Sequence, residues 1–321
     1  MKTLITNRIF AKAVILVAIV ALSTQIVFGY VLESIDVSNV VNKDFVVGPG
    51  KIEIELKPGE QRTVNLKVSN RMGDTRIFNV EIEDFRGSKN PQETVVLLGS
   101  ERGPYSLRDY LSVPEMNFEL QDGQRAIVPV TISVPTDAEP GGLYGSVLIT
   151  TTSKNQGAVG SGSSALISRI GTLFFVNVPG EVEADGKLVS FETVGDKKFY
   201  SKGPIDFRLL YENNGSVHVN PYGQVKITNI LGEEVGVVNV DPWFAMPDSL
   251  RLREVSWDRP FLFGLYKATA SVNRGYDDII DTQSLTFWVL PWTILVSVFV
   301  GLVVLVLLVR FVITHFEIRK K

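Results

Sequence analysis

Short segments of alternating apolar and polar residues recur through the middle of the chain. In Lys51–Leu56 the isoleucines and the leucine fall on one face and the charged residues on the other, and residues 63–68 and 77–82 repeat the pattern. This period of two is typical of strands in an antiparallel sheet that has one face in water. Turn signals separate the strands, as in Lys57-Pro58-Gly59-Glu60. Because no amphipathic helix lies between the strands, the pattern predicts an all-β fold of Ig-like sandwiches.

The predicted strands divide into two groups, which indicates two tandem antiparallel β-sandwiches. A chain of 321 residues has room for two domains of about 100–150 residues each. Val68–Gly73 and Leu210–Gly215 look like equivalent strand-to-turn corners of two related domains. We therefore predict sandwich domains over residues 30–183 and 184–290. Further strands are predicted over residues 126–134, 145–152, 166–178, 205–210, 224–230, 235–240, 251–256, 266–272 and 284–288.

The N-terminus has the three-part form of a signal peptide. It carries Lys2, Arg8 and Lys12 without an acidic residue, then an apolar run from Ala13 to Leu22 and a stretch of small residues that ends at Gly29. We predict an N-terminal signal helix over residues 1–29. The alternative is an uncleaved membrane anchor.

A second apolar segment lies near the C-terminus and predicts one transmembrane helix over residues 291–314. Trp292–Val309 contains 18 residues and no charge, close to the length that spans a bilayer. Basic residues are retained in the cytoplasm, so the tail over residues 315–321 is expected inside and everything between the two apolar segments outside. The side chains expected at the membrane interfaces are Trp288, Trp292, Arg310, Arg319, Lys320 and Lys321. The predicted protein is a single-pass plasma-membrane protein with an extracellular ectodomain in the cell envelope and the lipid bilayer as a partner.

Composition argues against catalysis, metals and nucleic acids. The chain has no Cys and two His, so disulfides, thiolate sites and histidine-assisted nucleophiles are not expected. We expect no enzyme activity, no metal and no cofactor. Residues 30–290 carry 25 basic and 34 acidic residues, a formal charge of −9. A net acidic ectodomain disfavours nucleic acid as a ligand.

Two stretches resemble a family of bacterial envelope proteins. Leu56–Asn70 (LKPGEQRTVNLKVSN) resembles an opening common to bacterial Ig-like envelope domains, and Leu120–Gln124 with Val130–Ser146 resembles their later strands. With the order of signal peptide, two domains, helix and basic tail, the chain is similar to the WxL-interacting protein family. The resemblance implies that the first domain binds peptidoglycan and that the second binds a host or partner.

A long connection over residues 86–114 holds the candidate binding residues. Long loops in sandwiches are often functional. The candidate side chains for stacking on a sugar and bonding to it are Tyr105, Arg108, Asp109 and Tyr110. The alternative is that Leu107, Tyr110 and Leu111 plug the end of the sandwich, and we favour this plugging role.

Three other features have a structural and a functional interpretation. The Gly/Ser-rich residues 153–164 are expected to be a flexible hairpin tip. The carboxylates of Tyr276–Asp281 are expected to form a solvated turn rather than a calcium site. The aromatic residues expected to fill the second core, rather than to form a binding face, are Trp243, Phe244, Trp257 and Tyr266.

The sequence as a whole predicts a membrane-anchored cell-surface protein that binds rather than catalyses. The expected partner is peptidoglycan, a secreted or surface protein, or both, held through loops or by edge-strand pairing. Two alternatives lack glycan binding: a surface adhesin or assembly scaffold, and a tethered chaperone-like protein. An enzyme that uses only carboxylates is the least favoured class.

Overall fold

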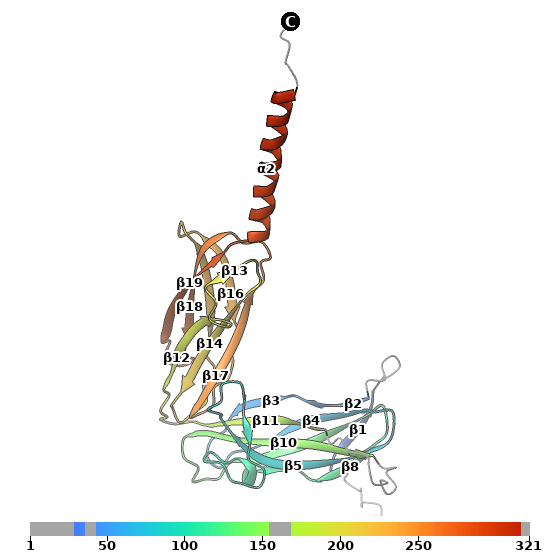
Figure 1. Ribbon diagram of the computed structural model, residues 1–321. Helices are drawn as coiled ribbons and strands as arrows, with labels where there is room; N and C mark the ends of the chain where they lie inside the picture. Colours follow the sequence, from blue (N-terminus) through green and yellow to red (C-terminus); the bar gives the residue numbers. More distant parts are fainter. Residues whose placement is uncertain (1–28, 36–42, 154–167, 316–321) are drawn as a thin grey trace, which may run out of the picture. The chain divides into compact units, whose positions relative to one another are not determined.

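The structure is a computed structural model that describes residues 29–35, 43–153 and 168–315, and it is built almost entirely from strands (Figure 1). The predicted signal peptide, the Gly/Ser-rich tip and the basic end of the tail lie outside the described residues. The elements that carry the first half are β1 (Val31–Ser34), β2 (Asp44–Gly48), β3 (Lys51–Glu55), β4 (Gln61–Arg71), β5 (Arg76–Arg86), β6 (Val96–Leu97), the 3₁₀ helix η1 (Arg108–Tyr110), β7 (Leu111–Ser112), β8 (Asn117–Leu120), β9 (Gln124–Ser133), β10 (Gly141–Ser153) and β11 (Arg169–Val178). The second half contains β12 (Gly186–Thr193), β13 (Phe199–Tyr200), β14 (Ile205–Asn213), β15 (Tyr222–Asn229), β16 (Glu234–Val240), β17 (Ser249–Trp257), β18 (Gly264–Asn273), β19 (Ile280–Val289) and α2 (Trp292–His315).

The chain forms two compact units, and their division does not follow a single cut in the sequence. Unit 1 comprises Met1–Ile82, Leu107–Asp137 and Gly145–Phe175, and the rest of the chain forms unit 2. Unit 2 therefore takes in two segments, Glu83–Ser106 and Ala138–Tyr144, from the range predicted as the first domain. The predicted domain ranges 30–183 and 184–290 stay a prediction, and the contacts divide the chain differently.

Hydrogen bonds inside unit 2 explain why it includes these two segments. The backbone N–H of Leu250 donates to the carbonyl of Ser88 over 3.0 Å. The backbone N–H of His218 donates to the Tyr144 hydroxyl over 2.8 Å, and the rings of these two residues meet edge to face. Tyr144 is fully buried. Hydrogen bonds between residues far apart in the sequence thus hold Glu83–Ser106 and Ala138–Tyr144 in unit 2. The sequence alone does not predict these contacts.

The strands β1 to β11 form the first sandwich, and its first sheet has the strand order β1-β9-β4-β2, with β7 also paired to β9. The second sheet has the order β3-β11-β10-β5-β6, with β8 also paired to β5. Alternation in β4 and β9 places Leu66 and Val128 in the core, and the rings of Phe45 and Phe78 join the two sheets at 5.6 Å.

Unit 2 is a second sandwich, made of the sheets β12-β14-β17 and β13-β19-β18-β15-β16. Its core includes Phe207 of the smaller sheet, which meets Phe287 of the larger one at 5.9 Å. The pairing is antiparallel apart from the two residues of β13, which run parallel to β19. The predicted all-β fold of two sandwiches with a C-terminal helix is confirmed.

The two predicted corners share one hydrogen-bonding pattern. Asn70 is fully buried, and its side-chain amide donates to the carbonyls of Asp74 and Leu120 over 2.8 and 3.0 Å. Its Oδ1 accepts the N–H of Met72, two residues on, over 3.0 Å. One side chain thus satisfies three backbone groups at the end of β4.

Asn213 repeats this pattern in unit 2. It is also fully buried, and its amide donates to the carbonyls of Val217 and Ala245 over 2.8 Å each. Its Oδ1 accepts the N–H of Gly215 over 3.0 Å. The spacing is the same at both corners. Each asparagine bonds the carbonyl of the residue four positions later and the N–H of the residue two positions later.

We expect Asn213→Ala to lower the free energy of unfolding by about 3 kcal/mol, because three buried backbone groups lose their partner. Asn229→Ala is the matched control. Asn229 bonds the N–H groups of Leu231 and Glu233 in a similar way, but in an exposed turn. Water replaces those bonds, so the control loses about 0.5–1 kcal/mol. Denaturant unfolding of the full chain in detergent measures both, and equal losses would contradict the assignment.

Candidate functional site

The residues predicted to bind a sugar lie around η1 and are partly engaged in packing. Tyr105 is half-buried, and its ring meets the edge of Tyr144 at 5.9 Å. Burial, and secondarily the charge of Asp248, raise the pKa of Tyr105. Leu107 is fully buried and Leu111 nearly so, as the plugging interpretation requires.

The other three candidates form η1 itself. Arg108 Nε lies 4.0 Å from Asp109 Oδ1, and Tyr110 is half-buried. The backbone N–H of Tyr110 donates to the carbonyl of Leu107 over 2.9 Å. Tyr105 belongs to unit 2, whereas Arg108, Asp109 and Tyr110 belong to unit 1. A role of these residues in peptidoglycan binding stays a prediction.

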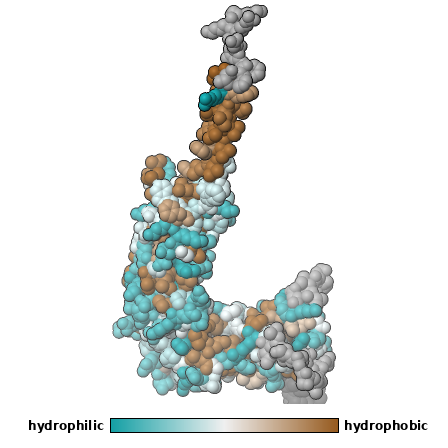
Figure 2. Space-filling model, in the orientation of Figure 1, coloured by the Kyte–Doolittle hydropathy of each residue, from teal (hydrophilic) through white to brown (hydrophobic). Residues whose placement is uncertain are grey.

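The C-terminal helix is long and apolar enough to cross a membrane. Among the described residues it is the one such helix, with a 20-residue span over Trp292–Phe311. Figure 2 shows its surface as almost continuously hydrophobic. Trp288 and Trp292 are exposed where β19 leads into α2, and Arg310 lies in the last turns. Arg319, Lys320 and Lys321 lie outside the described residues.

The aromatic residues predicted to fill the second core do so for the most part. Trp243, Trp257 and Tyr266 are buried in the core of unit 2. Phe244 is half-buried, and the guanidinium of Arg251 covers its ring at 5.4 Å. These residues are therefore not available as an aromatic binding face.

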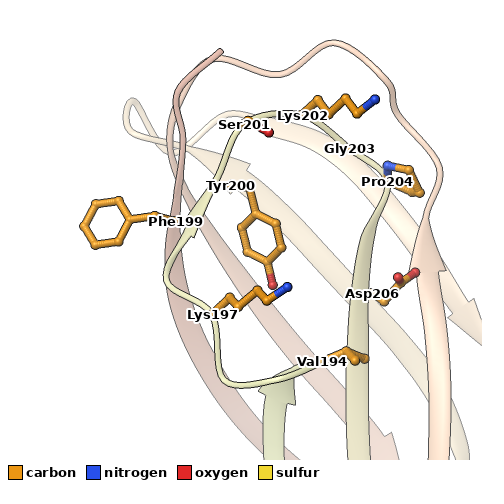
Figure 3. Close-up of a pocket in the computed structure, with 9 residues that line it drawn as sticks. All are labelled: Val194, Lys197, Phe199, Tyr200, Ser201, Lys202, Gly203, Pro204 and Asp206. Atoms are coloured by element: carbon orange, nitrogen blue, oxygen red, sulfur yellow. The ribbon is translucent and has the colours of Figure 1, made fainter. Parts of the chain in front are cut away.

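A surface pocket of about 420 Å³ lies at the end of unit 2 where β12, β13 and β14 are connected (Figure 3). It is lined by Val194, Lys197, Phe199, Tyr200, Ser201, Lys202, Gly203, Pro204 and Asp206. The sequence analysis missed this pocket. The one signal for it is the run of lysines between two predicted strands, which resembles an ordinary solvated loop.

The pocket is lined by charged and polar side chains as well as apolar ones. Lys197 and Lys202 supply two ammonium groups, and Asp206 supplies a carboxylate. In Figure 3 the Tyr200 hydroxyl lies toward Lys197, with Asp206 across the opening. The Tyr200 ring packs edge to face on Phe287 at 6.0 Å, while its buried hydroxyl has no hydrogen-bond partner within the described residues. No cluster of three or more metal-binding side chains occurs in that part of the chain.

The terminal strands of unit 2 differ in how well their outer edges are covered. The edge of β12 is covered by side chains of β19. Asp281 accepts the N–H of Leu188 over 2.8 Å, and Gln283 donates to the carbonyls of Leu188 and Val189. The edge of β17 is covered by a backbone segment, because Leu250 and Leu252 donate to the carbonyls of Ser88 and Pro91.

The edge of β16 is covered only at its start. Arg259 donates to the carbonyl of Val235 over 2.9 Å, and Gly236 lies against the indole of Trp257, with no space for a Cβ. No other hydrogen bond to the β16 backbone from outside its sheet occurs in the described ranges. Val237 is 43% exposed. Among the three terminal strands β12, β16 and β17, β16 therefore receives the fewest hydrogen bonds along its outer edge.

Comparisons with known proteins give no family for the chain. No family model matches it, and no curated protein does. Solved structures of fimbrial chaperones are similar to it at low identity. The class 5 fimbriae chaperone CfaA is 11% identical, over 77% of this chain and 100% of that one, with a TM-score of 0.35. The Escherichia coli chaperone DraB is 13% identical, over 76% of this chain and 96% of that one, also with a TM-score of 0.35.

A third similar structure is the CupB2 chaperone of Pseudomonas aeruginosa. It is 13% identical, over 74% of this chain and 98% of that one, with a TM-score of 0.33. TM-scores and identities this low transfer no function to this chain. Function must therefore be inferred from the chain's own residues.

We expect Tyr200→Phe to raise the free energy of unfolding by about 1 kcal/mol, because it removes a buried hydroxyl that has no hydrogen-bond partner. Tyr266→Phe is the matched control. The Tyr266 hydroxyl bonds both the N–H and the carbonyl of Phe263 over 3.1 Å, so its loss destabilises the chain by about 1 kcal/mol. Thermal unfolding compares the two variants. Destabilisation by Tyr200→Phe would show that a water molecule or a ligand bonds this hydroxyl.

Proposed function

We propose that the protein is a membrane-anchored assembly scaffold or chaperone-like protein that binds an extended segment of a protein partner along the free edge of β16. The observation that carries the proposal is the unequal protection of the terminal strands in unit 2. An unprotected edge presents backbone N–H and carbonyl groups to which another chain can add a strand. An unprotected edge supports a protein partner rather than a glycan.

The sequence of β16 suits strand addition. Glu234–Val240 reads EVGVVNV, with one charged residue and no proline. Protected edges in other proteins carry lysines, prolines or bulges, and β16 has one such irregularity, a register shift at Val235 near its start. Glu234 forms an ion pair with Lys226 at 2.7 Å, which keeps the single charge at the start of the strand. From Val237 to Asn239 the strand carries no charge: Val237 and Val238 are β-branched, and the exposed Asn239 is neutral.

Anchoring follows from the 20-residue apolar span of α2. With basic residues at its C-terminal end, both units lie on the exported side of the plasma membrane. The partner is then a secreted or surface protein.

We expect a photo-crosslinking residue at Val237 to form an adduct with one protein in intact cells, because strand addition brings the partner against this side chain. A crosslinker at Val189 is the matched control. Val189 is also 43% exposed on a terminal strand, but the edge of that strand is occupied by Gln283. Adducts are measured by gel shift and the partner is identified by mass spectrometry.

A second pair of variants tests whether the edge itself is required. With the crosslinker at Asn239, Val237→Lys should reduce the adduct about tenfold, equivalent to about 1.4 kcal/mol, because a lysine blocks strand addition. Val237→Thr keeps a β-branched side chain and should retain the adduct. Equal adducts at Val189 and Val237, or an adduct unaffected by Val237→Lys, would contradict the proposal.

A further inference from the structure

Three loops of unit 2 meet at the end of the sandwich from which α2 leaves. The strand register shows this, since Gly264 pairs with Val289, the last residue of β19, and Asn229 pairs with Tyr266. The loop between β17 and β18 and the turn between β15 and β16 therefore lie at this end (Figure 1). In the other sheet Ile205 pairs with Trp257, so the connection from β12 to β14 reaches the same end.

The start of α2 is close to these loops. Val289 ends β19 and Trp292 begins α2, and three residues reach at most about 10 Å. The N–H of Trp288 donates to the carbonyl of Lys198 over 2.7 Å, and that of Leu290 to the carbonyl of Tyr200 over 2.8 Å. These bonds hold the β12–β14 connection against the residues that precede the helix.

Each of the three loops exposes large apolar side chains. The exposed fractions are 69% for Phe199, 72% for Ile230, 78% for Leu231, 65% for Phe261 and 57% for Phe263. Trp288 and Trp292, where β19 leads into α2, are exposed as well. Large apolar groups gathered on one surface of a folded protein mark a contact with a membrane or with another protein.

The loops hold these side chains outward by specific bonds. Asn229 Oδ1 accepts the N–H groups of Leu231 and Glu233 over 3.0 Å, which fixes the turn that carries Ile230 and Leu231. The Tyr266 hydroxyl bonds the N–H and the carbonyl of Phe263. Their exposure is therefore built into the fold and does not reflect a loose loop.

Leu262 shows the same design within one loop. It is 2% exposed and packs into the core, while Phe261 and Phe263 on either side of it are exposed. The buried leucine anchors the loop and directs both rings away from the sandwich. A loop that served only to connect β17 and β18 would need no aromatic ring on its outer side.

We propose that the three loops form a membrane-docking face, with Phe199, Ile230, Leu231, Phe261 and Phe263 inserted into the interfacial layer of the bilayer that α2 crosses. The inference rests on the anchoring of α2 proposed above. The bilayer is the occupant because α2 begins at most about 10 Å from Val289, at the end of the sandwich where the loops lie, and exposed aromatic rings are enriched at the membrane interface.

Charge makes a small contribution to this docking. The residues from 194 to 204, 230 to 233 and 258 to 263 contain four basic side chains, Lys197, Lys198, Lys202 and Arg259, and three acidic ones, Asp196, Glu233 and Asp258. Such a balance gives little net attraction to anionic lipids. Docking is therefore driven by the burial of apolar area and should not require a charged bilayer.

The test is the depth of single nitroxide labels on the full chain reconstituted into phosphatidylcholine vesicles. The chain has no native Cys, so each label reports one site. Leu231→Cys and Phe263→Cys place labels on the docking face. We expect them to collide several-fold more often with oxygen, and several-fold less often with a water-soluble nickel chelate, than an aqueous label does.

Ile280→Cys is the matched control. Ile280 is 60% exposed on β19, about 30 Å along the strand from Val289, so its label should be aqueous. Leu302→Cys reports the depth of α2. Labels at Leu231 and Phe263 that behave like the one at Ile280, with Leu302 buried, would overturn the docking face and leave the anchor standing. An aqueous label at Leu302 would overturn the anchor and the docking face together.

Vesicles with added phosphatidylglycerol should give the same label depths. Docking found only in these anionic vesicles would overturn the proposal that apolar burial drives it.

Discussion

Both sandwiches depend on one buried side-chain amide at the same kind of corner. Asn70 and Asn213 each connect the end of a long strand to two carbonyls and one N–H of other segments. A buried backbone group without a partner costs about 1–3 kcal/mol, so these corners stay closed only while the asparagine is present. In unit 2 the bond to Ala245 holds the segment between β16 and β17. The positions of β16, which carries the proposed binding edge, and of β17 therefore depend on this contact.

Edge protection is the second organising constraint. Unit 2 has two short sheets and thus several terminal strands, each a potential site of unwanted association. The side chains of Asp281 and Gln283 on β19 bond to the edge of β12. The backbone carbonyls of Ser88 and Pro91 bond to the edge of β17. The edge of β16 is covered only where Arg259 and Trp257 reach it. This selective protection favours a role for β16 in binding rather than a general tolerance of open edges.

The long strands could be predicted from the sequence, because their burial follows a strict alternation, as in β9 and β14. The two corners were also recognised, since Val68–Gly73 and Leu210–Gly215 show a similar strand-to-turn pattern. β12 was missed because a register shift between Leu188 and Ser190 breaks its period, so that Leu188 and Phe191 are both buried three residues apart. A bulge of this kind leaves no pattern in a single sequence.

The sites were harder to predict than the fold. The pocket around Tyr200 is lined by one continuous stretch, residues 194–206, and it exists because of the path that the connection from β12 to β14 takes. Phe261 and Phe263 look like core residues in the sequence, and only the burial of Leu262 between them shows that they face outward. The predicted roles of Tyr105, Arg108, Asp109 and Tyr110 rest on the length and the side chains of one loop and stay predictions. The direction of a side chain in a loop does not follow from sequence periodicity. For this reason the loop residues were harder to predict than the strands.

The most direct test of the account is the membrane topology of the full chain. Single-Cys variants Ile280→Cys and Lys320→Cys, in a chain without native Cys, are treated in intact cells with a maleimide that does not cross membranes. Ile280→Cys should be labelled in intact cells, and Lys320→Cys only after the membrane is opened. Labelling of Lys320→Cys in intact cells, or protection of Ile280→Cys until lysis, would contradict an anchored scaffold whose binding units lie outside the membrane.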